Sequence, residues 1–207
     1  MEFDKIVKGR RSVRKYFDKK VEKEKIMKVI DAARYAPTAC NYQNWHFVIV
    51  DDKNILEKLH FVGAFHVKIS PTNIFVFYDK RFVNKKYQDH IQSASAAIMT
   101  IIYRAYELGL GTCWVCDLPD ENLVKKILCV PKYYQLIAMV NIGYPKQIKF
   151  SKKKLKPLEE IYSFNKYIKK GGTLTGIYPS HKNSIIFKVK SIIRKFLVRL
   201  YTFLRNR

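Results

Sequence analysis

The 207-residue chain has few cysteines and no long uninterrupted apolar run, and each shortage narrows the class of protein it can be. Four cysteines (Cys40, Cys113, Cys116 and Cys129) do not make a disulfide framework at this length, so we expect a reducing compartment. No stretch reaches the roughly 20 apolar residues that a membrane-spanning helix needs. The start of the chain has no basic segment followed by an apolar run, so we expect no signal peptide and a cytoplasmic protein.

Acidic residues are also scarce, and the shortage is uneven. Lysine and arginine number 40 against 17 aspartates and glutamates, a formal charge of +23, and residues 151–207 alone carry 15 basic and 2 acidic side chains. The excess favours an anionic partner such as nucleic acid, a phosphorylated ligand or an acidic membrane, although solvated lysine-rich faces give the same composition. Hydrophobic residues make up 48% of the chain, which is enough for one packed domain.

Hydrophobic periodicity predicts interleaved helices and strands, and therefore a mixed α and β fold. A turn at 17–18 precedes a helical pattern that runs to Pro37. The helix predicted over 89–111 is apolar or small almost all round, which places it at the centre of the fold or in a subunit interface. The other expected helices cover 2–9, 54–62 and 120–130, and the expected strands cover 46–52, 72–79, 112–118 and 134–145.

The composition changes after residue 145. We expect the folded domain to span 1–168, with an extended basic arm over 146–160, and a Gly- and Pro-containing linker over 169–183. Residues 184–207 return to a helical pattern with an apolar face and about seven basic residues around it. This pattern indicates either an interfacial helix attracted to anionic lipid or a helix that packs on a protein surface. Nucleic-acid binding is less favoured, because no recognised module is present.

Two short segments contain side chains suited to ligand binding. "GRRSVRKY" (9–16) concentrates Arg10, Arg11, Ser12 and Arg14, whose donors suit a phosphate or several carbonyl oxygens, although a solvated basic turn would look the same. "APTACNYQNW" (36–45) presents Thr38, Asn41 and Gln43 in a loop without charge. Amide groups that donate and accept suit a heterocycle, while Thr and Asn are also ordinary turn residues.

The Cys-x-x-Cys pair in "GLGTCWVCDLP" (109–119) has an alternative to redox chemistry. A reactive thiol of this kind begins a helix, where its pKa falls, whereas Cys113 and Cys116 fall in a predicted apolar strand. The five histidines provide no companion pair for a zinc site. We therefore expect both cysteines to be buried strand residues, and no metal.

Four motifs in order resemble the FMN-dependent nitroreductase family: "RRSVRKY", "APTACNYQNWHF", "GLGTCW" and "KPLEE". The resemblance covers residues 3–167. It implies an α+β fold with a mostly antiparallel central sheet flanked by helices, in an intertwined homodimer that holds two FMN molecules at its interface. It also implies hydride transfer from NADH or NADPH through flavin N5 to a nitroaromatic, a quinone or a similar small acceptor.

The resemblance assigns the cofactor contacts to both subunits. Arg10, Arg11, Ser12 and Arg14 would contact the phosphate and the N1 side of FMN, and Pro37, Thr38, Asn41 and Gln43 would come from the partner subunit. A fixed cation such as Arg14 would stabilise the negative charge of the reduced flavin. No catalytic side chain is expected, because the cofactor does the chemistry.

The chain departs from the family pattern at two places. Val115, Cys116 and Asp117 stand where relatives usually have Ile-Gly-Gly, whose backbone lies near the reactive edge of the flavin, which leaves open whether Cys116 faces it. In the arm, lysines stand where relatives offer arginines, so the candidates for the phosphate are Lys153, Lys154 and Lys156. An alternative is therefore a flavin-fold or basic binding protein with reduced catalysis that acts at a membrane or with a protein partner.

Overall fold

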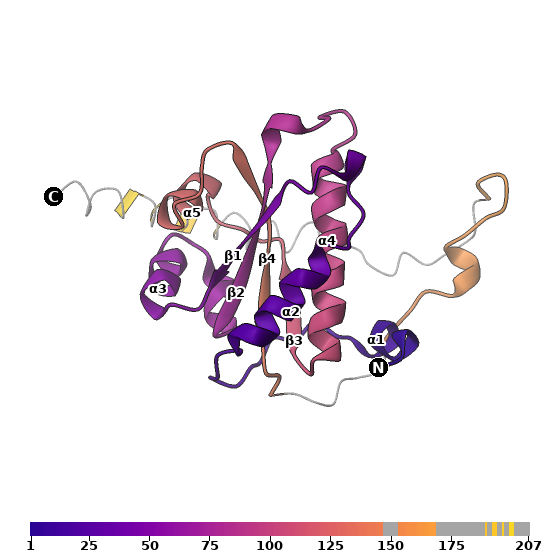
Figure 1. The fold of residues 1–207 in the computed structure, drawn as a ribbon, viewed down its shortest axis with the longest axis horizontal. Helices are drawn as coiled ribbons and strands as arrows, with labels where there is room; N and C mark the ends of the chain where they lie inside the picture. Colours follow the sequence, from indigo (N-terminus) through magenta and orange to yellow (C-terminus); the bar gives the residue numbers. More distant parts are fainter. Residues whose placement is uncertain (147–152, 169–188, 190–191, 194–195, 197–198, 201–207) are drawn as a thin grey trace.

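The structure, a computed structural model, describes residues 1–146 and 153–168, and six helical positions of the C-terminal segment: 189, 192, 193, 196, 199 and 200 (Figure 1). In these residues a four-stranded sheet has the order β1-β2-β4-β3, and every neighbouring pair is antiparallel. The strands are β1 (Trp45–Val50), β2 (Thr72–Asp79), β3 (Gly111–Val115) and β4 (Tyr134–Gly143). The predicted antiparallel α+β fold is confirmed.

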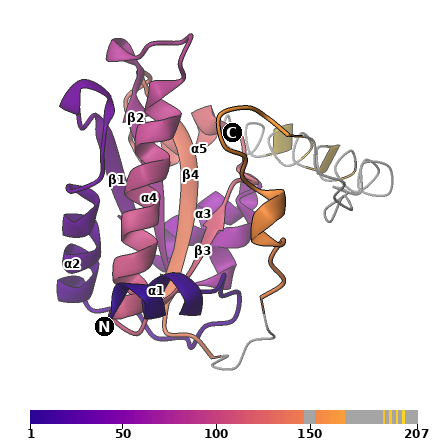
Figure 2. The ribbon, with the colours of Figure 1, turned by 90° about the vertical axis from the view of Figure 1, so that its right-hand side faces the viewer.

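Helices cover both faces of the sheet (Figure 2). Helices α2 (Lys23–Ala33) and α4 (Asp89–Glu107) pack on one face, and α3 (Lys53–Phe61) and α5 (Glu121–Ile127) on the other. The short α1 (Phe3–Gly9) contacts α4. Short 3-10 turns occupy 39–41, 65–69, 80–82 and 158–160.

Strand β2 lies in the middle of the core, which explains its continuous apolar run. Ile74 and Val76 point toward α2 and α4, while Phe75 and Phe77 point toward α3 and α5, and all four are fully buried. Alternate residues of a strand face opposite sides, so a strand covered on both sides is apolar throughout. Burial of each such side chain contributes about 1.5–3 kcal/mol.

Helix α4 is the element that separates the two ends of the predicted site. Ala94, Ala97 and Ala105 are fully buried, and their small side chains let the helix approach the sheet and α2 closely. The helix ends before Gly109, whose φ of 76° lies in the left-handed region that favours glycine, and β3 begins two residues later.

Several predicted boundaries need correction. α2 ends at Ala33 instead of continuing to Pro37, and α4 ends at Glu107. β3 ends at Val115, so the prediction that Cys116 is a buried strand residue is wrong: Cys116 is exposed, whereas Cys113 is buried as expected. The strand stops there because the chain turns at residues 116–118, where the Leu118 N–H donates to the Cys116 carbonyl.

The predicted linker over 169–183 and most of the predicted helix over 184–207 lie outside the described residues. Among the residues that are described, no helix combines the length and the apolarity needed to cross a membrane.

Candidate functional site

The basic segment after α1 lies along the free edge of β3. Ser12 forms a parallel bridge with Thr112, and the Val13 N–H donates to the Thr112 carbonyl at 2.8 Å. Gly111 permits this approach, because a Cβ at Gly111 would lie 2.7 Å from Cγ2 of Val13. The backbone that carries the arginines is therefore part of the sheet edge rather than a free loop.

A second set of contacts holds the far end of the same segment. The Phe17 N–H donates to the Tyr144 carbonyl, and the Lys146 N–H donates to the Lys15 carbonyl, each at 2.9 Å. The buried Tyr16 hydroxyl donates to the Val13 carbonyl at 2.7 Å, and burial raises the pKa of Tyr16 far above its ordinary value. Arg14 thus lies between two anchored stretches of backbone.

Among the described residues, no acidic side chain pairs with the arginines of this segment. The ion pairs among the described residues do not include Arg10, Arg11 or Arg14. Arg11 instead donates to the carbonyls of Lys8 and Arg10, at 2.9 and 3.1 Å. A hollow of about 280 Å³ lies beside Arg10 and Arg11. Its other walls include Tyr106, Pro145 and residues 109–112. Guanidinium donors without an acidic partner beside a hollow suit an anionic ligand.

The end of β3 lies near Arg14. Burial raises the pKa of the Cys113 thiol, and the Arg14 guanidinium partly offsets this effect, so the two groups are electrostatic neighbours. Cys116 is exposed just beyond the strand, and Val115 is buried against α3 and α5, which leaves the backbone of Val115 as the part a ligand could meet. His66 pairs with Asp117 at 3.4 Å. No sequence signal linked residues 66 and 117.

The amide loop contains three residues in the left-handed region: Cys40, Asn41 and Gln43, with φ of 50°, 55° and 51°. Gln43 Nε2 donates to Asn41 Oδ1 at 3.0 Å, and the Gln43 N–H donates to Thr38 Oγ1 at 3.3 Å. Such backbone strain clusters at ligand sites and needs surrounding support.

Support for this loop comes from α4. Ser93 Oγ accepts from the Ala39 N–H at 3.2 Å. A hollow of about 350 Å³ lies here, and it is lined by Pro37, Thr38, Ala39, Asp89, Gln92, Ser93 and Ala96. Ser93 is a supporting residue that sequence reasoning missed, because it looked like one more small residue of a buried helix.

One chain keeps the two groups of predicted ligand residues apart. Ser93, under the amide loop, and Tyr106, beside Arg10 and Arg11, both belong to α4. At 1.5 Å of rise per residue their positions are about 20 Å apart along the helix axis. The arginines and the amide loop of the same chain therefore do not converge on one small ligand.

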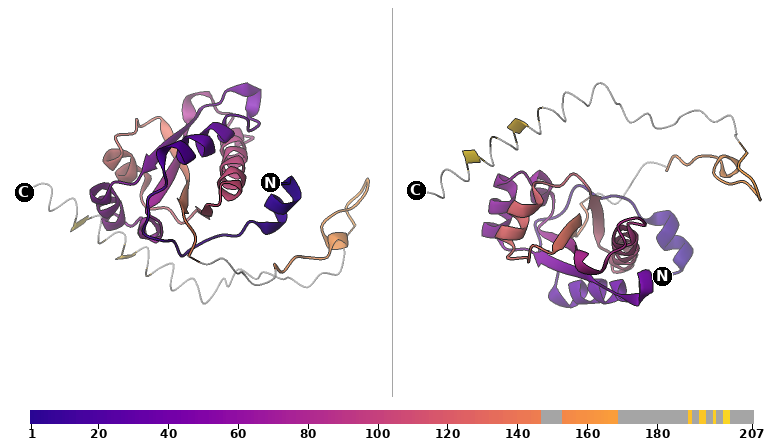
Figure 3. Two further views of the ribbon diagram at one scale, coloured as in Figure 1. Left: turned by 60° about the horizontal axis from the view of Figure 1, so that its bottom comes forward. Right: turned by 90° about the horizontal axis from the view of Figure 1, so that it is seen from above.

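The basic arm does not bring the arginines and the amide loop of one chain together. Lys153, Lys154 and Lys156 are exposed in an extended segment that projects from the domain (Figures 1 and 3). Large apolar side chains of the arm and of the residues after it, up to 168, are also exposed: Leu155, Leu158, Ile161, Tyr162, Phe164, Tyr167 and Ile168. A run of exposed apolar side chains of this extent marks a surface that another protein covers.

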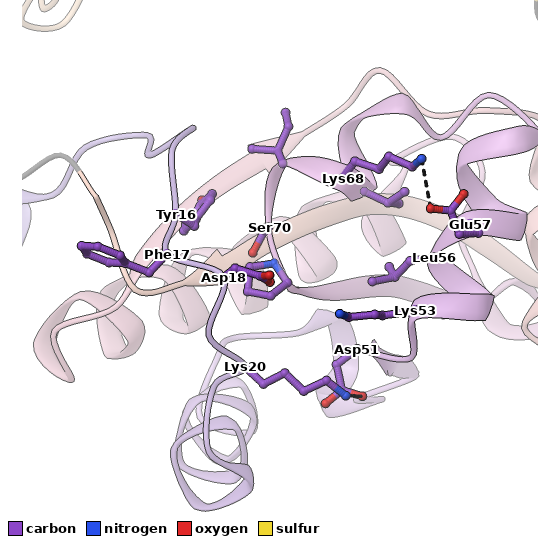
Figure 4. Close-up of a pocket in the computed structure, with 13 residues that line it drawn as sticks. Tyr16, Phe17, Asp18, Lys20, Asp51, Lys53, Leu56, Glu57, Lys68 and Ser70 are labelled. Atoms are coloured by element: carbon purple, nitrogen blue, oxygen red, sulfur yellow. Dashed lines mark ion pairs between the residues drawn. The ribbon is translucent and has the colours of Figure 1, made fainter.

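A groove of about 360 Å³ lies elsewhere, between the 16–20 segment and the start of α3 (Figure 4). Its walls carry the ion pairs Lys20–Asp51 at 3.5 Å and Lys68–Glu57 at 3.1 Å. The charges at this groove largely compensate one another, so it lacks the unpaired positive charge of the β3 edge. Within the described part of the chain no cluster of His, Cys, Asp and Glu could hold a metal ion.

Comparisons with known proteins identify the family of the chain. The family model described as "Nitroreductase family" matches residues 7–60 and 59–144. A protein of Archaeoglobus fulgidus, provisionally named an NADH dehydrogenase/NAD(P)H nitroreductase, is 33% identical over 150 residues, which cover 70% of this chain and 86% of the relative.

Solved structures show the same fold. An FMN-dependent nitroreductase from Clostridium difficile R20291 aligns with a TM-score of 0.69 and 32% identity, over 80% of this chain and 100% of the other. A nitroreductase family protein from Clostridium difficile 630 aligns with a TM-score of 0.70 and 31% identity, over 81% and 100%. The chain therefore belongs to the nitroreductase family.

Proposed function

We propose that this protein is an FMN-dependent oxidoreductase that passes hydride from NADH or NADPH to a small acceptor such as a nitroaromatic or a quinone. The observation that carries the proposal is the row of arginines that backbone hydrogen bonds fix along β3 and that no carboxylate of the described chain neutralises. Relatives whose names specify FMN and NAD(P)H support the same choice of cofactor and electron donor.

The residues present fit FMN by their chemistry. Arg10, Arg11 and Ser12 provide donors for a phosphate, and Gly111 keeps the backbone beside them free of a Cβ that would displace Val13. Lys153, Lys154 and Lys156 are further candidates for the phosphate as point charges. Pro37, Thr38, Asn41 and Gln43 offer an uncharged surface with amide donors and acceptors, which suits the edge of the flavin ring.

The side chains have binding and electrostatic roles. When bound, FMN supplies the atom that accepts and donates hydride, N5, so the protein needs no nucleophile or general acid for that step. Arg14 holds a permanent positive charge, which stabilises negative charge at the N1 side of the ring. The backbone at Val115 and Cys116 would lie near the same ring, where the exposed Cys116 side chain would take up part of the space for the acceptor.

We propose a homodimer in which each site takes its arginines from one chain and its amide loop from the other. The separation of these groups by about 20 Å along α4 supports this division. The exposed apolar side chains of residues 155–168 support a partner that covers them, since Phe164 is 79% and Tyr167 87% exposed.

We place the enzyme in the cytoplasm. All four cysteines are free thiols, and Cys40 and Cys129 are exposed, which suits a reducing compartment.

The test is the visible absorption spectrum of the purified protein, recorded before and after NADH or NADPH is added without oxygen. We expect flavin bands in the blue and near ultraviolet that bleach on addition. A colourless protein that stays colourless when FMN is supplied would contradict the proposal and favour a binding protein that has lost the cofactor.

A further inference from the structure

The C-terminal segment lies beyond the part of the chain that the family fold accounts for. The family match ends at residue 144, and the FMN-dependent nitroreductase of Clostridium difficile R20291 is aligned over its whole length while 80% of this chain is covered. The fold and the candidate flavin site therefore give the last helical positions no role.

The described positions of this segment present an apolar stripe to solvent. Val189, Ile192, Ile193 and Phe196 are helical, and their side chains are 47%, 65%, 45% and 65% exposed. Spacings of three, four and seven residues place them on one side of a helix. Exposure of such a stripe is unfavourable unless another apolar phase covers it.

The charge of the surrounding sequence indicates which kind of surface covers this stripe. After Glu160 the chain contains no aspartate or glutamate, and residues 184–207 contain seven lysines and arginines. Arg199, which is helical and exposed, continues directly from the apolar stripe. An apolar face flanked only by positive charge matches the boundary between anionic headgroups and acyl chains. A nucleic acid would satisfy the charge but would leave Phe196 and the isoleucines exposed.

We propose that the C-terminal segment binds the surface of an anionic phospholipid bilayer through its described helical positions, with the stripe of Val189, Ile192, Ile193 and Phe196 inserted among the lipids. This surface is separate from the flavin site, so the enzyme would work next to a membrane without spanning it. The excess of basic residues in the first 150 positions adds a weaker, longer-range attraction to the same surface.

The full-length protein should sediment with vesicles of equal parts phosphatidylcholine and phosphatidylglycerol, and should stay in solution with vesicles of phosphatidylcholine alone. F196D should weaken partitioning onto the anionic vesicles by about tenfold or more, because it removes apolar burial as well as adding a negative charge. S191D adds the same charge without removing an apolar side chain and should weaken partitioning by about fivefold or less.

Three outcomes would overturn the proposal. One is the absence of binding to anionic vesicles, and another is equal binding by a truncation that ends at Lys170. The third is an equal loss in F196D and S191D, which would indicate attraction to any polyanion. Sedimentation is scored by protein mass, and the flavin spectrum of each variant is recorded separately, so a failure of the proposed catalytic function would be recognised as a different result.

Discussion

The two halves of the candidate site are built by different means. The basic half is held by backbone hydrogen bonds to β3 and to the residues after β4, so its position follows from the sheet. The amide half is held by a side-chain bond from Ala39 to Ser93 and by the Asp79 N–H, which donates to the Asn44 carbonyl, and it contains three left-handed residues. In the second half Gln43 and Asn41 bond to each other. The basic half is thus anchored to the sheet by backbone bonds, whereas in the amide half part of the donors and acceptors are bonded to each other.

The largest expected effect is the loss of charge from the anchored half. R14A should lower flavin affinity or slow flavin reduction by about 10- to 100-fold, because hydrogen bonds to charged groups contribute about 1.5–3 kcal/mol. The measurement is flavin titration by fluorescence together with stopped-flow reduction by NADH. K15A is the matched control, because Lys15 is the adjacent exposed cation and its backbone contact with Lys146 remains. Full retention of both properties in R14A would contradict the placement of Arg14.

A change at Gly111, where the arginine segment packs on β3, should alter the position of the arginines without altering their charge. G111A puts a Cβ against Val13 and should reduce the free energy of unfolding by about 1–3 kcal/mol, with weaker flavin binding, because the arginine segment must move off β3. Denaturant unfolding and flavin titration measure the two effects. In the G111A/V13G double variant the Val13 atoms that crowd the new Cβ are all absent, so flavin affinity should recover even though the lost Val13 burial keeps stability low. Failure to recover would show that this close approach does not position the arginines.

The amide half should respond more weakly, since only one bond supports it from α4. S93A leaves the Ala39 N–H without its acceptor and should cost about 1 kcal/mol of stability, with flavin affinity lowered by a few fold. S95A on the same helix is the control and should change unfolding by less than about 0.5 kcal/mol. Equal effects of S93A and S95A would show that Ser93 does not hold the loop.

The smallest effect concerns acid stability next to the basic half. The Tyr144 hydroxyl donates to Glu22, the Glu22 N–H and Lys19 add to this effect, and together they lower the pKa of Glu22 to about 2. A carboxyl with a lowered pKa in the folded state stabilises the protein above its ordinary pKa, and this contribution is lost as the pH falls from about 4.5 to 2.

E22Q should therefore flatten the fall in unfolding free energy over that pH range, measured by urea titration at several pH values. E24Q, which lies two residues further along in the first turn of α2, should keep the wild-type slope. If the unfolding free energy of E22Q followed that of the wild type at every pH, the bond between Tyr144 and Glu22 would not stabilise the fold.

Sequence periodicity located most elements because their apolar residues recur at regular spacing. β2 was predicted over 72–79 and occupies Thr72–Asp79. The end of β3 could not be read from "TCWVCDL", since Cys116 and Leu118 continue the apolar composition while backbone pairing with β4 stops at Val115. Local composition does not report where a neighbouring strand ends.

The candidate site was predictable only in part. The ligand residues were named from motifs, and their assignment to two subunits came from family resemblance and stays a prediction. The supports were hidden, because Ser93, Gly111 and Tyr144 are distant in sequence from the residues they hold and have no unusual local pattern. The order of the strands likewise depends on tertiary packing, and so does the separation of about 20 Å along α4 between the amide loop and the arginines.

The division of the site between two chains is tested most directly by mixing two deficient variants. R14A and N41A/Q43A are unfolded together, refolded as a mixture and compared with each variant alone by bound flavin per chain. If each site combines Arg14 of one chain with the amide loop of the other, a mixed dimer regains one intact site, and random pairing restores roughly one site in four. A mixture that binds only the average of the two separate variants, although mixed dimers form, would contradict the account.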